Sequence, residues 1–200
     1  MPRAMSFPLL LALAACAPSA SPSPAQGAVA FFARACMPLD REHAVSTARQ
    51  AGMTEVPVTV APEPDQSMLR DTDARLFGIR ATSGEGMVLI WQEPLICEVR
   101  IVGVDQDEVG RAFEGLLATV KADPRVIAQD VSPAQFAAAQ AQEPASFRAD
   151  YRLRRAAVLG DAPLGGAARG LSMRVSVSGE PVETILMAKS ATPDAPRRAR

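Results

Sequence analysis

The order of apolar and polar positions divides the body of the chain into two series of helices and strands. In the first series, apolar residues at helical spacing predict a helix through 29–36, which Pro38 ends. Asp40 is placed to cap a second helix, and Pro57 limits the next segment to an edge strand. The remaining elements expected here are a helix over 41–51, a strand over 55–60, a helical turn over 65–71, and strands over 75–81, 87–92 and 95–102.

The second series opens with the most regular helical pattern of the chain, over 107–122. Its apolar residues form one continuous stripe, and Pro124 ends the helix. The pattern of Ser132, Pro133 and Gln135 is typical of a capped helix start. The other elements expected are a strand over 125–129, a helix over 133–141, and strands over 147–153, 171–177 and 182–188.

Short connections between consecutive strands favour antiparallel pairing. We therefore expect an α+β fold in which an antiparallel sheet of two three-strand meanders has helices packed on one face. The strand over 87–92 is apolar on both faces, which is typical of a central strand. The two series also share one order of elements. Either an internal duplication or coincidence explains this, because residue identity between the halves is negligible.

The start of the chain has the features of an export signal. Arg3 precedes an apolar run over 7–15, which at ~1.5 Å per residue is too short to cross a hydrocarbon core of ~30 Å. Such a run predicts a cleaved signal peptide over 1–15. The run ends in Leu13-Ala14-Ala15-Cys16, which resembles the lipobox of bacterial lipoproteins.

That resemblance implies that Cys16 is lipidated on its sulfur, that cleavage occurs before it, and that its new amine is acylated. Ala17, where some lipoproteins have Asp, implies sorting to the outer membrane, facing the periplasm. A plain signal peptide with a chance cysteine is the alternative. On this basis we expect a lipidated Cys with a Pro/Ser tether over 16–27, a single α+β domain over 28–189, and a disordered basic tail over 190–200.

The other two cysteines both fall on inward faces of their elements. Cys36 lies on the apolar face of the first helix, and Cys97 shares a strand face with Val99 and Ile101. In an exported chain this favours a disulfide, whereas two buried thiols or a redox pair remain as alternatives. A cysteine in the first helix and a second one shortly after Trp91 loosely resemble uncharacterised small exported proteins of proteobacteria. That resemblance covers residues 28–120 and implies no activity.

Composition excludes several function classes. A net charge of −1 argues against a nucleic-acid partner, and one His with three Cys leaves no zinc or haem motif and no expected metal or cofactor. His43 is the sole histidine available to a hydrolase, and the chain has no GxSxG motif. The Gly-rich segment 160–166 lacks the Lys-Ser/Thr pair of a phosphate loop.

Carboxylates gather at two places. Asp71 and Asp73 flank the start of a strand, and a second group comprises Asp105, Asp107 and Glu108. The second group offers oxygen ligands to Ca²⁺, but compensation of the helix dipole is the simpler explanation.

Arginines are the clearest binding candidates. Four of them fall on polar positions of the strands expected over 147–153 and 171–177: Arg148, Arg152, Arg154 and Arg174. If these strands pair, the arginines form a stripe that can bind anionic groups bidentately. A solvated outer face is the alternative.

Together these features predict a lipid-anchored envelope protein that is a non-enzymatic interaction or structural module. Its expected partners are the membrane, through Cys16, and an envelope protein or an anionic glycan or lipid. The alternatives are an envelope hydrolase that uses His43 and a carrier of anionic ligands on the arginine stripe.

Overall fold

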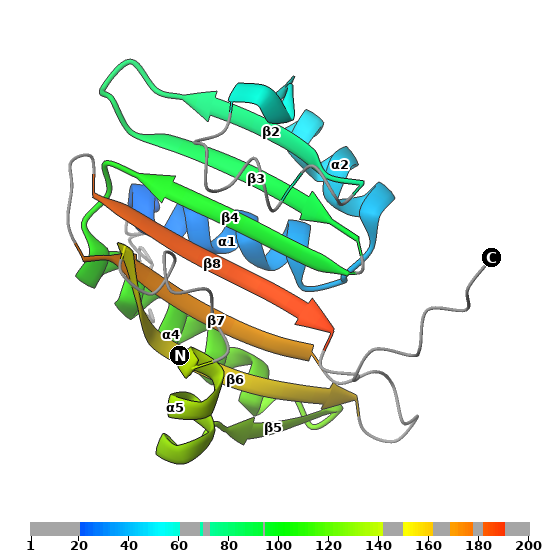
Figure 1. Cartoon of the computed structure of the whole chain (residues 1–200), viewed down its shortest axis with the longest axis vertical. Coiled ribbons are helices and arrows are strands. Elements are labelled where there is room, and N and C mark those ends of the chain that lie inside the picture. The colour runs from blue at the N-terminus through cyan, green and yellow to red at the C-terminus, as the bar shows by residue number, and fades with distance from the viewer. Residues whose placement is uncertain are drawn as a thin grey trace, which may run out of the picture.

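The structure is a computed structural model, and it describes residues 21–60, 69, 73–93, 95–141, 150–161, 169–177 and 182–190. Its strands form one antiparallel sheet of eight strands in the order β1-β2-β3-β4-β8-β7-β6-β5 (Figure 1). The strands are β1 (Thr54–Val56), β2 (Arg75–Arg80), β3 (Gly86–Gln92), β4 (Ile96–Val102), β5 (Val126–Asp130), β6 (Tyr151–Asp161), β7 (Arg169–Ser176) and β8 (Glu183–Ser190). The predicted α+β fold with two meanders is confirmed.

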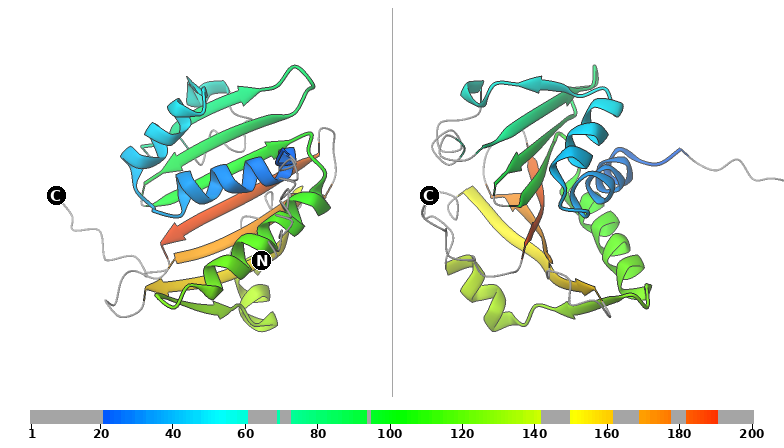
Figure 2. Two further views of the ribbon diagram at one scale, coloured as in Figure 1. Left: turned by 180° about the vertical axis from the view of Figure 1, so that it is seen from behind. Right: turned by 90° about the vertical axis from the view of Figure 1, so that its right-hand side faces the viewer.

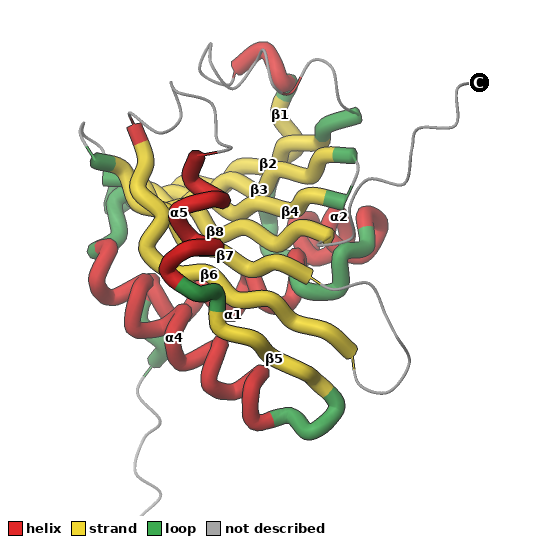
Figure 3. The backbone as a smooth tube through the Cα atoms, turned by 60° about the horizontal axis from the view of Figure 1, so that its bottom comes forward, coloured by secondary structure: helices red, strands yellow, loops and turns green. Residues whose placement is uncertain are grey.

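Helices cover one face of this sheet. They are α1 (Pro24–Cys36), α2 (Arg41–Gln50) and α4 (Gln106–Ala122), and all three lie on the same side in Figure 2. A further helix, α5 (Pro133–Ala141), lies on the other side of the sheet near β5 and β6, as Figures 2 and 3 show. It starts with the expected reciprocal bonds between Ser132 and Gln135.

The sheet order is symmetrical about the pairing of β4 with β8, where Val99 lies opposite Leu186. On one side of this junction the chain runs α1, α2, β1, a 3₁₀ turn (Val58–Val60) and β2-β3-β4. On the other it runs α4, β5, α5 and β6-β7-β8. This is the arrangement that an internal duplication would produce. Helix α2 has no counterpart in the second half.

The main core lies between the sheet and α1, α2 and α4. Trp91, Phe77, Phe32 and Phe113 are its largest fully buried side chains. The rings of Phe32 on α1 and Phe113 on α4 lie 6.1 Å apart, so the two helices meet through them.

The predicted disulfide is present and lies in this core. Cys36, at the end of α1, is bonded to Cys97 on β4, with the two Cα atoms 5.2 Å apart and both residues fully buried. Cys97 also pairs across the sheet with Trp91. The bond therefore fixes the end of the first helix to a central strand.

The first helix begins earlier than the sequence analysis predicts. Ser23 caps α1 by accepting a bond from the Gln26 backbone N–H at 3.3 Å, and the Ser23 backbone N–H donates to Gln26 Oε1 at 2.9 Å. Pro24 occupies the first turn, where its missing N–H costs nothing, and Ala25 is buried. The tether expected over 16–27 is therefore wrong from Pro24 to Gly27, and the folded domain begins before residue 28.

Two strands also differ from their predictions. The strand expected over 55–60 is short, because the backbone turns into a 3₁₀ helix directly after Pro57. Strand β6 starts at Tyr151 and continues to Asp161, past the predicted end at 153. Residues 147–149 of that prediction lie outside the described part, as do residues 65–68, 70 and 71 of the helical turn.

Removal of the disulfide should destabilise the fold strongly. The bond closes a loop of 61 residues, for which the chain-entropy model gives about 4 kcal/mol of stabilisation. We expect Cys36→Ala/Cys97→Ala to lower the free energy of unfolding by about that amount in urea titrations. Addition of reductant should shift the wild-type midpoint and leave the variant unchanged. Equal midpoints for the two proteins in the absence of reductant would contradict this role of the bond.

The end of α4 carries an ion pair whose effect on pKa can be measured. A side-chain hydrogen bond from Arg125 at 2.7 Å, with a second from the Arg125 backbone, lowers the pKa of Asp123 to about 2. Arg125→Ala should raise this pKa towards the ordinary value of 3.8, as followed by NMR of the Asp123 carboxyl carbon. The pKa of Asp123 is lower in the folded state than in the unfolded state. The stabilisation from this pair is therefore fully present above pH 3.8 and is lost as the pH falls through about 2. An unchanged titration in the variant would show that the pair does not form.

Candidate functional site

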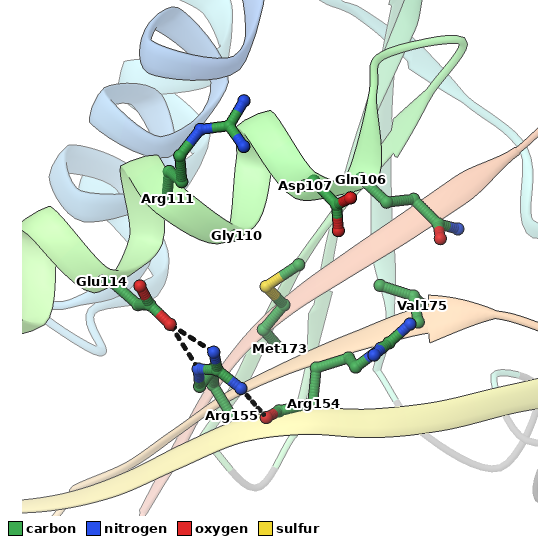
Figure 4. A pocket seen from close by; sticks show the side chains of 9 residues that line it. All are labelled: Gln106, Asp107, Gly110, Arg111, Glu114, Arg154, Arg155, Met173 and Val175. Carbon is green, nitrogen blue, oxygen red and sulfur yellow. Dashed lines mark hydrogen bonds and ion pairs between the residues drawn. The ribbon is translucent and has the colours of Figure 1, made fainter.

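A bulge in β6 positions a group of charged side chains beside α4. Leu153 pairs with Arg174 on β7, and Arg155 pairs with Met173, so that Arg154 is an extra residue between them. Because paired residues share a face of the sheet, Arg155 lies with buried Met173 on the helix side. The extra residue turns Arg154 towards this side as well, next to α4 (Figure 4).

The predicted arginine stripe is wrong. Arg152 pairs with Val175, which faces the helices, whereas Arg174 lies on the opposite face beside Leu153. Arg174 is buried, and its Nη1 donates to Ser172 Oγ at 2.7 Å. The prediction assumed that side chains alternate without interruption along β6. One extra residue moves every earlier side chain of the strand to the opposite face of the sheet. Arg148 lies outside the described residues.

A cavity of about 210 Å³ separates α4 from β6 and β7 at this bulge (Figure 4). Met173 and Val175 form its apolar floor. Its walls come from α4 and β6, and the lining comprises Gln106, Asp107, Gly110, Arg111, Glu114, Arg154 and Arg155 in addition to the floor residues.

Two interactions fix the walls of the cavity. Arg155 Nε donates to Glu114 Oε1 at 2.6 Å, and Arg155 Nη1 donates to the carbonyl of Arg154 at 2.9 Å. At the other end, Gln106 Nε2 donates to Ser176 Oγ at 3.2 Å. The ion pair therefore ties β6 to α4, and the amide ties the first turn of α4 to β7.

Three charged residues of the lining form no ion pair with a described residue: Asp107, Arg111 and Arg154. Asp107 projects from α4 and Arg154 from β6, and both are exposed. Among the described residues, neither side chain forms an ion pair. Arg111 points away from Arg155 in Figure 4. Among the described residues, the lining includes no Ser, Thr, Cys or His and therefore no Ser–His or Cys–His pair.

The opposite face of the sheet carries a buried charge network that the sequence analysis missed. Arg100 on β4 donates to Glu98 at 2.5 Å and lies 3.9 Å from Glu183 on β8. The Tyr151 hydroxyl on β6 donates to Glu183 as well. Glu98 and Arg100 are both buried. Charged residues two apart within an apolar strand were the available signal, since they must share one face.

His43 has a structural position. Its Nε2–H donates to the carbonyl of Arg34 at 2.9 Å, and its backbone N–H donates to Asp40 at 2.7 Å. The side chain thus joins the first turn of α2 to the last turn of α1. Both Cys36 and Cys97 are in the disulfide, so neither is a free thiol near this histidine.

The carboxylate candidates have structural partners too. Asp105 caps α4 by accepting from the Glu108 backbone N–H at 2.8 Å, and Asp73 pairs with Arg41 at 2.6 Å. Within the described ranges, no group of three or more His, Cys, Asp or Glu side chains is placed to hold a metal ion. Asp71, Cys16 and most of the Gly-rich segment lie outside those ranges.

No protein family model, curated protein or solved structure matches this chain. Among the helices that the structure describes, none combines the length and the apolar character needed to cross a bilayer.

The role of His43 can be tested through stability. His43→Ala removes one hydrogen bond between helices, which contributes about 1 kcal/mol, and we expect a loss of that size in urea unfolding. Gln50→Ala is the control, because among the described residues the Gln50 side chain bonds Ser46 of its own helix and exposed sites of this kind change stability by less than ~0.5 kcal/mol. Equal effects of the two substitutions would exclude a special linking role for His43.

Proposed function

We propose that this chain is a lipoprotein of the bacterial cell envelope, anchored through lipid on Cys16 and facing the periplasm from the outer membrane. Its folded body serves as a binding module. The lipobox residues Leu13-Ala14-Ala15-Cys16 provide the anchor, and the cavity beside α4 provides the surface for a ligand.

The observation that carries this proposal is the buried disulfide between Cys36 and Cys97. Structural disulfides form and persist in oxidising compartments such as the periplasm and are rare in the cytosol. The third cysteine, Cys16, is the one that follows the apolar signal run. Export therefore accounts for all three cysteines with two distinct roles.

The start of α1 limits how far the body can lie from the anchor. Residues 17–22 separate Cys16 from Ser23, the cap of α1. At ~3.5 Å per extended residue, this connection reaches about 25 Å at most. Several acyl chains on one cysteine would hold the protein far more firmly than a single chain, because each buried CH₂ contributes about 0.8 kcal/mol. The body would thus remain close to the bilayer.

Binding is favoured over hydrolysis by the placement of the candidate residues. His43 is engaged with the backbone of α1, and the cavity presents Asp107 and Arg154 without a nucleophile beside them. Transport of anionic ligands along one continuous arginine stripe is not proposed, because Arg152 and Arg174 lie on opposite faces of the sheet.

Lipidation can be tested by metabolic labelling of the full chain with a clickable fatty-acid analogue. The wild type should incorporate label and sediment with membranes, whereas Cys16→Ser should do neither. Cys36→Ala/Cys97→Ala is the matched control: it lacks the other two thiols and should still be labelled, whatever its stability. Label on Cys16→Ser, or a wild-type N-terminus that retains residues 1–15, would refute the anchor.

A further inference from the structure

We propose that the cavity between α4 and β6 binds phosphoethanolamine, a zwitterion with a phosphate at one end and a primary ammonium at the other. The lipid headgroup is its expected source, and that part of the inference rests on the proposed lipid anchor. The juxtaposition that points to this ligand is an open anion, Asp107, and an open cation, Arg154, on facing walls of one small cavity.

Five charged residues line the cavity, and one of them, Arg111, points away from Arg155 in Figure 4. The other four form one closed pair and one open pair. Arg155 and Glu114 satisfy each other at the end of the cavity further along α4. Asp107 and Arg154 are not joined by an ion pair, although both line the same cavity. A ligand with a single charge would satisfy one of them only. A ligand with both charges can meet the carboxylate with its ammonium and the guanidinium with its anionic end.

The anionic end is assigned as phosphate because of the donor that faces it. A guanidinium presents its N–H groups in a planar fork that matches two oxygens of one phosphate. Arg154 keeps this fork open, since no described residue bonds its guanidinium; the bond that Arg154 accepts from Arg155 is at its backbone carbonyl. Below the charged walls, Met173 and Val175 offer an apolar floor for the two methylenes that separate phosphate from ammonium.

Gly110 makes room for such a ligand. It lies in the middle of α4 on the cavity wall, where a Cβ would come no closer than 3.6 Å to Met173 Cε. An alanine would therefore fit, and a glycine inside a helix costs roughly 1 kcal/mol relative to alanine. Glycine at this position leaves the space beside Met173 open.

The position of the cavity favours a membrane lipid as the source. Arg111 lines both this cavity and a neighbouring hollow that Ser23 and Gln26 of α1 also line. The first turn of α1, which follows the short connection to Cys16, is thus next to the first half of α4. A chain anchored at Cys16 would hold the cavity near the headgroups of its own bilayer.

Binding is tested on the full processed chain, purified in a nonionic detergent and titrated calorimetrically with phosphoethanolamine. We expect saturable binding by the wild type and affinities at least tenfold lower for Arg154→Gln and for Asp107→Asn. Gly110→Leu, which fills the cavity, should also abolish binding. Arg152→Gln is the matched control, because Arg152 is exposed on the same strand but does not line the cavity. Thermal unfolding of each variant establishes that it remains folded.

The chemistry of the ligand is tested with its parts. Inorganic phosphate and ethanolamine should each bind at least tenfold more weakly than phosphoethanolamine, because each satisfies only one wall. Equal binding of phosphate alone would overturn the role of Asp107. Glycine that binds as tightly as phosphoethanolamine would overturn the phosphate assignment, and unchanged affinity in Arg154→Gln would overturn the site.

A lipid arm distinguishes the two sources of the headgroup. The protein is placed in vesicles of phosphatidylcholine with or without phosphatidylethanolamine, and the NMR signal of the Met173 Cε methyl group is compared. A lipid ligand should shift this signal only in vesicles that contain phosphatidylethanolamine, and the shift should be absent in Asp107→Asn. If the signal does not shift but soluble phosphoethanolamine binds, the ligand is a free metabolite and not a lipid headgroup.

The two proposals fail separately. If the chain is not lipidated, the wild type takes up no label, and the calorimetric titration still tests whether the cavity binds phosphoethanolamine. A labelled wild type that binds no phosphoethanolamine would leave the anchor intact and refute the cavity ligand.

Discussion

The pairing of β4 with β8 is the interaction on which the rest of the structure depends. It joins strands that are more than eighty positions apart along the chain, for example at Val99 and Leu186, and it converts two meanders into one sheet. On the helix side, both residues contribute to the core beneath α1 and α4. On the other side, the same pairing brings Arg100 of β4 near Glu183 of β8. Without this junction neither half has a complete core, because α1 packs against α4 as well as against β4.

The sequence predicted the elements with strong periodicity and failed where one residue changed the alternation. The stripe along α4 was clear because it extends over about three turns, and the helix matches the prediction within one residue at its start. The disulfide was also predictable, since Cys36 and Cys97 each fell on an inward face. The arginine stripe failed because the bulge at Arg154 cannot be seen in a pattern of alternating residues. Register is a property of two strands together, and a single strand does not encode it.

The start of α1 was missed for a different reason. The Ser23–Gln26 capping box and Pro24 were present in the sequence, but the small and proline-rich residues around them are also typical of a solvated tether. Burial of Ala25 shows that the segment is a helix start and not a solvated tether, and that burial depends on contacts with the rest of the fold. The same limit applies to the contact of Arg100 with Glu183, which requires the neighbouring strand β8 to be in place.

The candidate site exists because the two halves are unequal. In the first half, α1 and α2 both cover the helix face of the sheet, whereas α2 has no counterpart in the second half and α5 lies on the other side (Figure 2). Helix α4 must therefore cover this part of the face alone, and beside β6 it leaves a cavity bordered by charged side chains. The bulge places Arg154 in that space, which a regular strand would not do. The disulfide and Trp91 lie in the first half, whereas the cavity lies against the strands of the second half.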